Sequence, residues 1–240
     1  MWGVLPVKNF ENAKTRLAPA LTPEERRTLF PLMVEDVLAA MAASDLDGVL
    51  VLTNEPAAGA LAKQYGARVE GEPENQGQSE AVMRAMQILE AEEVQSALQL
   101  PGDIPGVSPA EINRLAAEHS ARGARAMTIV QGHDGKGSNA LAVSPPTLMP
   151  FHFGHDSFGP HLAEARAADV EPVILGGLPG IALDIDTGED LAKLLAGDWG
   201  PSKAIAWARE QPFSRTLSPY GRPRAVQAGG DCAPGRRFLP

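Results

Sequence analysis

Basic residues cluster near the start of a chain that is otherwise acidic. Lys8, Lys14 and Arg16 lie within nine residues, whereas the formal net charge of the 240 residues is -9. They follow a short apolar run at 2–7, which predicts a first strand. A loop that leaves the carboxyl end of a parallel strand is where α/β sheets bind ligands. Cations placed there suit an anion, and a nucleotide's phosphates suit them best. The alternative is a solvated loop that happens to be basic.

Aspartates at two later points have the chemistry of magnesium ligands. Asp103 follows an apolar run at 96–100 that predicts a strand, and Gly and Pro residues flank it. Asp184 and Asp186 alternate along a segment that we expect to be a strand, so their carboxylates would share one face. Mg²⁺ takes one or two carboxylates plus phosphate oxygens, and two carboxylates this close need a cation or solvent. The sequence thus predicts a Mg²⁺ site, with turn or helix capping as the alternative role.

Two polar loops offer further donors to a ligand. A loop with three glycines carries Lys136, Ser138 and Asn139, and glycine lets a backbone approach a ligand closely. Its spacing differs from the Walker A pattern, which disfavours a P-loop NTPase. The turn-rich segment 71–80 contains Ser79, the expected N-cap of the next helix, where backbone N–H groups could meet a ligand. An ordinary loop with a helix cap is the alternative there.

Helices and strands alternate along the chain, and their order must bring these residues together. Thr22 and Glu25 form a capping box before apolar residues spaced four apart, which predicts a long helix. Apolar runs at 49–52 and 67–69 predict strands joined by a helix over 56–65. The later elements expected are strands at 96–100, 126–130 and 139–143 and helices after Ser79, Ser108 and Thr187 and over 201–209. We therefore expect an α/β fold, with a mostly parallel central sheet and helices on both faces in three layers.

Composition limits the class of protein. With 44% hydrophobic residues, the chain can bury one full core, which we place at 1–196; the extension at 197–240 would be partly disordered or packed on the domain or a partner. The acidic balance argues against binding to nucleic acid or anionic membranes, and no apolar run reaches the roughly 18 residues of a membrane span. The single cysteine, Cys232, cannot form an internal disulfide, and the N-terminus lacks a signal-peptide pattern. We expect a soluble, cytoplasmic protein.

Four separated stretches carry motifs that can be compared with known families. They are Pro-Val-Lys with Ala-Lys-Thr-Arg-Leu in 6–17, Pro-Gly-Asp-Ile-Pro at 101–105, the segments 134–141 and 151–161 together, and Asp-Ile-Asp-Thr-Gly-Glu-Asp-Leu in 180–191. In this order they resemble the CofC/FbiD family of guanylyltransferases, and the resemblance covers about residues 2–195. It implies a GT-A-like nucleotidyltransferase fold, Mg²⁺ as cofactor, and transfer of GMP from GTP to a small phosphorylated acid in coenzyme F420 biosynthesis. The implied acceptors are 2-phospho-L-lactate, phosphoenolpyruvate and 3-phospho-D-glycerate.

The resemblance also implies a role for each group of candidate residues. The expected sets are Lys8, Lys14 and Arg16 as catalytic and triphosphate-binding residues; Gly77, Gln78 and Ser79 near the base; Asp103, Asp184 and Asp186 as metal ligands; and Lys136, Ser138, Asn139, Gly154 and Ser157 around the acceptor. The base segment aligns only loosely. Lys136 is an addition to the family's acceptor segment, and Ser138 replaces a threonine, so the natural acid stays open. His161 matches the family without a role that we can derive.

Two other functions stay open at this point. A nucleotidyltransferase for a sugar phosphate or molybdopterin would share the fold and the metal aspartates, although Pro-Val-Lys replaces its glycine-rich signature here. A nucleotide-binding regulator without turnover would fit the departures at Gln78 and Lys136. Mg²⁺-dependent release of pyrophosphate separates an enzyme from a regulator. A homodimer contact through the C-terminal extension is also left open.

Overall fold

A seven-stranded sheet forms the centre of the protein. The computed structural model describes residues 1–10, 14–72 and 77–214. The strand order is β3-β2-β1-β4-β6-β5-β7. The strands are β1 (Trp2–Pro6), β2 (Gly48–Leu52), β3 (Arg68–Glu70), β4 (Ala97–Gln99), β5 (Ala126–Gln131), β6 (Ser138–Ser144) and β7 (Val173–Ile174). Among these described strands β6 alone runs antiparallel to its neighbours, so the expected mostly parallel sheet is confirmed.

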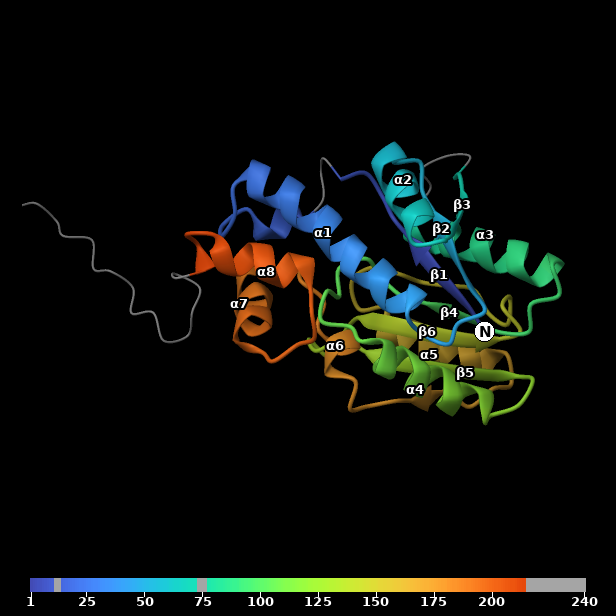
Figure 1. Ribbon diagram of the computed structural model, residues 1–240. Helices are drawn as coiled ribbons and strands as arrows, with labels where there is room; N and C mark the ends of the chain where they lie inside the picture. The colour runs from blue at the N-terminus through green and yellow to red at the C-terminus, as the bar shows by residue number, and fades with distance from the viewer. Residues whose placement is uncertain (11–13, 73–76, 215–240) are drawn as a thin grey trace, which may run out of the picture.

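Helices cover both faces of the sheet and complete the three expected layers (Figure 1). The helices on one face are α1 (Pro23–Ala42), α2 (Pro56–Gln64), α4 (Pro109–Ser120) and α6 (Pro179–Ala182), and those on the other are α3 (Gln78–Ala91) and α5 (Phe158–Ala167). Successive strand residues point to opposite faces, so Leu5 packs in the first of these cores and Val4 in the second. The burial of apolar side chains on both faces holds the layers together.

Local capping explains where several helices begin. Thr22 and Glu25 close the predicted capping box of α1, and Ser108 forms the corresponding box at α4. The expected N-cap at Ser79 is wrong, because α3 begins two residues earlier, after Gly77. Gly77 has a φ of 119°, a conformation that glycine adopts without strain. The Ser79 hydroxyl instead accepts a hydrogen bond from the Phe153 N–H at 2.9 Å.

The segment that carries Asp184 and Asp186 is a loop, which corrects the expected strand. Helix α6 ends at Ala182, and the loop 183–187 leads to α7 (Gly188–Ala196). The Ile185 N–H donates to the Asp103 carbonyl at 2.9 Å, which fixes this loop beside the end of β4. Its alternating pattern arises because Leu183 and Ile185 are buried among helices, while the aspartate that follows each of them lines a cavity. The alternation therefore reports burial on one side and not membership of the sheet.

A third hydrophobic cluster lies beyond the sheet, between α1, α7 and α8 (Lys203–Glu210). Figure 1 shows α7 and α8, in orange, beside the N-terminal part of α1. Among the members of this third cluster are Leu17, Leu29, Leu183, Ile185, Leu191, Leu194 and Ile205. Asp36 of α1 also accepts hydrogen bonds from the Ser202 hydroxyl at 2.6 Å and the Lys203 N–H at 2.7 Å. The C-terminal extension expected from residue 197 thus begins packed on α1 and α7.

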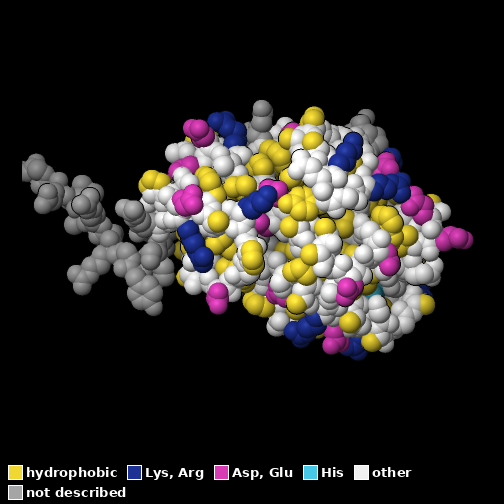
Figure 2. Space-filling view, viewed as in Figure 1, with side chains coloured by type: hydrophobic (Ala, Val, Ile, Leu, Met, Phe, Trp, Pro, Cys, Tyr) yellow, Lys and Arg dark blue, Asp and Glu magenta, His cyan; other side chains and the backbone are white. Residues whose placement is uncertain are grey.

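Some sequence-based expectations fall on residues that the structure does not describe. They concern 11–13 in the basic N-terminal loop, 73–76 in the turn-rich segment, and Cys232 within 215–240. In the described part of the chain, no helix has the length and apolar character needed to cross a membrane. On the face in Figure 2, basic and acidic side chains are interspersed with hydrophobic ones, as is usual for a solvated surface.

Candidate active site

The carboxyl ends of β1 and β4 border a cavity of about 730 Å³. These strands are parallel neighbours, and the chain runs from β1 outward to β2 and β3 before it returns to β4 on the other side. Such a reversal of strand order is where open α/β sheets bind ligands, in pockets of about 300–1,000 Å³. The cavity wall contains every predicted site residue except Gly77, Ser79 and Lys136. The topology therefore brings together residues that lie far apart in the sequence.

Lys14 lies between two of the predicted metal ligands. Its Nζ donates to Asp103 Oδ2 and, at 2.6 Å, to Asp186 Oδ1. Its side chain is only 7% exposed. Burial lowers the pKa of Lys14, but the charges of Asp103 and Asp186 outweigh that effect and raise the pKa above its ordinary value. Lys14 therefore stays charged and joins the loop after β1 to the end of β4 and to the loop 183–187.

Two further basic side chains of the predicted phosphate-binding set line the same cavity. Arg16 Nη1 donates to Asp186 Oδ2 at 3.2 Å, and the Arg16 side chain is 66% exposed. Lys8 is also an exposed residue of the cavity wall. Because both heads reach solvent, they can turn toward an anionic ligand without the cost of leaving a buried partner.

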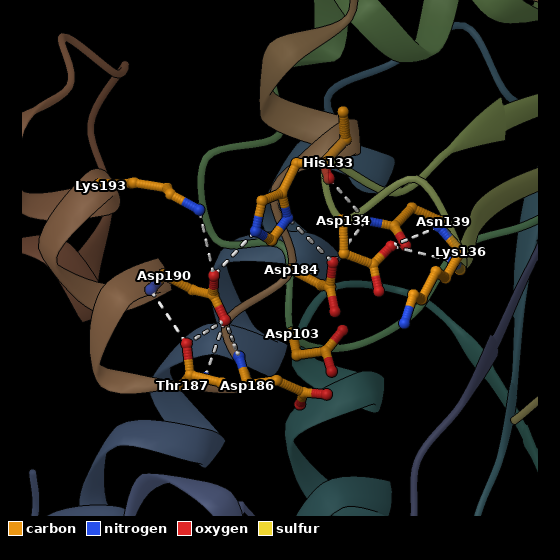
Figure 3. Close-up of polar contacts among 12 residues, drawn as sticks. Asp103, His133, Asp134, Lys136, Asn139, Asp184, Asp186, Thr187, Asp190 and Lys193 are labelled. Carbon is orange, nitrogen blue, oxygen red and sulfur yellow. Dashed lines mark hydrogen bonds and ion pairs between the residues drawn. The ribbon is translucent and has the colours of Figure 1, made fainter. Parts of the chain in front are cut away.

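Asp184 stands in a different environment from the other two aspartates. Its Oδ1 accepts a hydrogen bond from Asn139 Nδ2 at 2.9 Å, and His133 Nδ1 lies 3.6 Å from the same oxygen. Burial raises the pKa of Asp184, and the neighbouring charge of Asp103 raises it further. Figure 3 shows the carboxylates of the three aspartates directed toward one region. A cation placed there would relieve the repulsion between them.

The donor atoms of this cluster fit a hard divalent cation. Asp103 Oδ1 is buried and has no hydrogen-bond partner, which is costly for a carboxylate oxygen unless a ligand satisfies it. Aspartate oxygens are preferred ligands of Mg²⁺. Across residues 1–10, 14–72 and 77–214, however, no three His, Cys, Asp or Glu side chains stand at metal-holding geometry. The ammonium of Lys14 lies between Asp103 and Asp186 instead.

Behind the aspartates lies a second layer of contacts that the sequence did not reveal. Asp190 accepts hydrogen bonds from the Thr187 N–H at 2.8 Å and from the Asp186 N–H at 3.3 Å, and it lies 2.8 Å from His133 Nε2. Burial raises the pKa of Asp190, but the Thr187 hydrogen bonds outweigh it and lower the pKa. In Figure 3, His133 lies between Asp184 and Asp190. The only sequence signal was the Thr187 cap of α7, which left these contacts unspecified.

The cavity is also lined by four of the predicted acceptor-binding residues, namely Ser138, Asn139, Gly154 and Ser157. Ser138 and Ser157 are buried hydroxyl residues, and the Ser138 N–H donates to Ser157 Oγ at 3.0 Å. Gly154 has a φ of 144°, which a residue with a side chain rarely adopts. Asn139 has a supporting position, because its Nδ2 donates to the Ala182 carbonyl at 2.9 Å as well as to Asp184.

Three predicted residues, Gly77, Ser79 and Lys136, lie outside the cavity wall. Asp134 lines the cavity although it was not among the predicted site residues. Lys136 belongs to a turn in which Asp134 Oδ1 accepts the Lys136 N–H at 2.8 Å and the Gly137 N–H at 3.0 Å. Burial raises the pKa of Asp134, but these two hydrogen bonds outweigh it and lower the pKa. Asp134 itself lines the cavity. Its place in an Asp-Gly turn was visible in the sequence, but the direction of its carboxylate was not.

Comparison with solved structures defines the class to which this fold belongs. A putative nucleotide-diphospho-sugar transferase from Desulfovibrio desulfuricans G20 matches with a TM-score of 0.73 and 18% identity, over 90% of this chain and 97% of that chain. Glucosyl-3-phosphoglycerate synthase from Mycobacterium tuberculosis, solved with Mn²⁺, uridine diphosphate and phosphoglyceric acid, matches with a TM-score of 0.51 and 16% identity, over 81% and 77%. The chain thus shares its fold with these two solved structures, the second of which contains a divalent metal.

Comparison of sequences then gives the family. The family model described as guanylyl transferase CofC like matches residues 1–209. A phosphoenolpyruvate guanylyltransferase from Conexibacter woesei is 38% identical over 194 residues, covering 80% of this chain and 86% of the relative. A 2-phospho-L-lactate guanylyltransferase from Methanothermobacter thermautotrophicus is 31% identical over 192 residues, covering 80% and 82%. The chain belongs to the CofC-like guanylyl transferase family and is an enzyme of the nucleotidyltransferase class, which confirms the resemblance of its four motif stretches.

Proposed function

We propose that this enzyme transfers GMP from GTP to a small phosphorylated carboxylic acid and releases pyrophosphate. The acceptor is 2-phospho-L-lactate, phosphoenolpyruvate or 3-phospho-D-glycerate, in a coenzyme F420-type pathway of the cytoplasm. The observation that carries the proposal is one cavity lined by a charged cluster, Lys14 with Asp103 and Asp186, and also by the buried hydroxyl residues Ser138 and Ser157. The names of the relatives support guanylyl transfer and two of these acceptors.

The proposed reaction requires the protein to position its two substrates and to neutralise the charge of their phosphates. An oxygen of the acceptor's phosphate attacks the α-phosphorus of GTP in line, and the bond from that phosphorus to the bridging oxygen breaks. Pyrophosphate leaves with the electron pair. A phosphate nucleophile is already ionised at neutral pH, so no general base is required. The cations Lys8, Lys14 and Arg16 would hold the triphosphate and stabilise the leaving group. Positioning and charge neutralisation of this kind are the main sources of catalysis in such a site.

The three aspartates complete this proposal. Asp103, Asp184 and Asp186 would hold Mg²⁺, which when bound neutralises charge on the nucleotide and acceptor oxygens. The unpartnered Asp103 Oδ1 supports this assignment. The ammonium of Lys14 balances the charge of two of these carboxylates.

The first test measures pyrophosphate release with Mg²⁺ from each of four nucleoside triphosphates combined with each of the three acids. We expect release with GTP and with one preferred acid. Pyrophosphate release with sugar phosphates as acceptors in place of the acids would favour the alternative hypothesis, a nucleotidyltransferase for a sugar phosphate. No pyrophosphate release with any acceptor, in a protein that still binds nucleotide, would favour a regulator without turnover.

Asp103→Asn tests the metal assignment in the same assay. The substitution leaves the backbone carbonyl that accepts the Ile185 N–H, so we expect little change in thermal unfolding. Turnover should be lost, because a neutral amide is a poor ligand for Mg²⁺. Retained Mg²⁺-dependent turnover in this variant would remove Asp103 from the set of metal ligands.

A further inference from the structure

A fully buried histidine contacts Ser138, one of the hydroxyl residues that line the cavity. His161 lies on α5 and is 0% exposed. Its Nδ1 is 2.9 Å from Ser138 Oγ, and its Nε2 is 2.9 Å from the backbone nitrogen of His152. Neither contact has a part in the proposed reaction so far. Each ring nitrogen nevertheless has one polar partner, and the kind of partner differs between the two.

The backbone of His152 determines which ring nitrogen carries the hydrogen. A backbone N–H can only donate, so His161 Nε2 must offer its lone pair. Burial lowers the pKa of His161 to about 4, with a smaller contribution from the charge of His152, so the ring is neutral at pH 7. A neutral imidazole has one N–H, which is therefore on Nδ1. The Phe153 ring packs edge-on against the imidazole at a centroid distance of 4.9 Å and helps to hold its orientation.

This tautomer sets the direction of the hydrogen bonds at Ser138. The Nδ1–H of His161 donates to Ser138 Oγ, and the Ser157 hydroxyl donates to the same oxygen at 3.2 Å. A serine hydroxyl has two lone pairs and one hydrogen. Both acceptor positions of Ser138 are thereby filled, and its hydrogen is left for the cavity that it lines. In the opposite tautomer, Nδ1 would accept a hydrogen bond from the Ser138 hydroxyl. A lone pair of Ser138 Oγ would then face the ligand in place of the hydrogen.

We propose that His161 is a positioning residue that makes Ser138 an obligate hydrogen-bond donor to the anionic acceptor. Ionised carboxylate and phosphate groups accept hydrogen bonds but cannot donate them. A hydroxyl that can only donate therefore favours their binding. A ligand that presents a donor at this point finds no partner and is disfavoured. The identity of the ligand as a phosphorylated acid rests on the proposed function, whereas the direction of the hydrogen bonds rests on the contacts of His161 alone.

Two substitutions of His161 separate its two contacts. An asparagine can place its amide NH₂ near the former Nδ1 and still donate to Ser138, but it loses the contact with His152. A glutamine can place its carbonyl oxygen near the former Nε2 and still accept from His152, but it loses the donor to Ser138. We expect His161→Gln to raise the KM for the acid about tenfold, the loss of about one hydrogen bond, and His161→Asn to raise it less than about threefold. The KM for GTP should stay the same in both.

Ser138→Ala provides the matched control for this comparison. If His161 acts through the Ser138 hydroxyl, then His161→Gln should add nothing to the KM for the acid once that hydroxyl is gone. A purely structural role predicts the contrary, with lower thermal stability in both His161 variants and no selective change in the KM for the acid. Equal KM values for the acid in His161→Gln and wild type would overturn the proposal.

The tautomer itself can be measured without turnover. In the full-length wild-type protein labelled with ¹⁵N-histidine, His161 is one of five histidines and is assigned by the signal that His161→Asn removes. We expect a neutral ring with hydrogen on Nδ1 at pH 7, and an Nε2–H tautomer or a charged ring would refute the inference. If no acid supports pyrophosphate release, the proposed function fails while this measurement stands. If turnover is present but the tautomer is wrong, only the inference fails.

Discussion

At Lys14 a single ammonium group compensates two carboxylates that belong to different loops. Asp103 and Asp186 are 21% and 35% exposed, so neither has full access to water as a screen for its charge. Loss of Lys14 would leave both carboxylates without this cation, at a cost of up to about 3 kcal/mol, whereas loss of one carboxylate leaves Lys14 paired with the other. The same two carboxylates are predicted metal ligands. If they bind a divalent cation as proposed, we expect that cation and Lys14 to compete for one place between them.

Lys14→Met tests this competition. We expect the turnover to fall at least about 100-fold, because a cation that faces the phosphates is lost. We also expect Mg²⁺ to raise the melting temperature of the variant more than that of the wild type, since the metal no longer displaces an ammonium. Differential scanning fluorimetry across a Mg²⁺ series measures this, with Lys63→Met on α2 as the control for loss of a surface charge. An equal rise in variant and wild type would mean that lysine and metal occupy separate places.

Most of the site residues predicted from residue types and spacing lie in the cavity wall, but the direction of each side chain could not be predicted. Lys8, Lys14 and Arg16 could be predicted because they follow a strand whose carboxyl end must lie at the binding edge. Lys136 could not be judged in the same way, because the turn closed by Asp134 decides where its side chain points. His161 acts through contacts with residues 9 and 23 positions away, which leave no local pattern.

At the scale of elements, the loop 183–187 is held by the first turn of the helix that follows it. Asp190 receives hydrogen bonds from the Thr187 N–H and hydroxyl, both at 2.8 Å, and from the Asp186 N–H at 3.3 Å. A carboxylate at this position also favours the positive end of the α7 dipole. The cap of α7 and the placement of Asp186 are therefore one structural feature.

Asp190→Ala should affect stability and metal dependence together. We expect a loss of about 1–2 kcal/mol in the free energy of unfolding, typical of a removed helix cap. We also expect a higher Mg²⁺ concentration for half-maximal turnover, because Asp186 is no longer fixed. Glu25→Ala removes the equivalent N3 residue from the capping box of α1, does not touch the cavity wall, and should cost similar stability without this shift. If both variants shift the Mg²⁺ dependence equally, the cap of α7 has no special link to the site.

The contrast between correct and incorrect elements has a physical cause. The capping boxes at Thr22 and Ser108 were visible because a cap is made by residues three apart in the sequence. The loop 183–187 was mistaken for a strand because buried Leu183 and Ile185 alternate with partly exposed aspartates, as they would in a sheet. The sequence pattern records which side is buried, and only the tertiary structure shows whether a neighbouring strand is present.

At the scale of the whole molecule, the layered fold followed from the order of its elements, whereas the third hydrophobic cluster did not. The alternation of strands and helices in the first half suffices to predict a parallel sheet with helices on both faces. The packing of α7 and α8 against α1 joins segments from both ends of the chain, so no local pattern indicates it. This cluster also contains Leu17, just after the basic loop, and Ile185, between two predicted metal ligands.

The third cluster should therefore couple the C-terminal helix to the site. Ile205 of α8 is 3% exposed in this cluster, and Ile112 of α4 is 0% exposed in the cluster on the sheet, so the two offer a matched pair. Ile205→Ala and Ile112→Ala should each cost about 2–5 kcal/mol of unfolding free energy, through lost burial and a cavity. Assayed well below both melting temperatures, Ile205→Ala alone should raise the Mg²⁺ concentration for half-maximal turnover severalfold, because it loosens the support beneath Asp184 and Asp186. An equal Mg²⁺ dependence in the two variants would show that the cluster contributes stability without positioning the site.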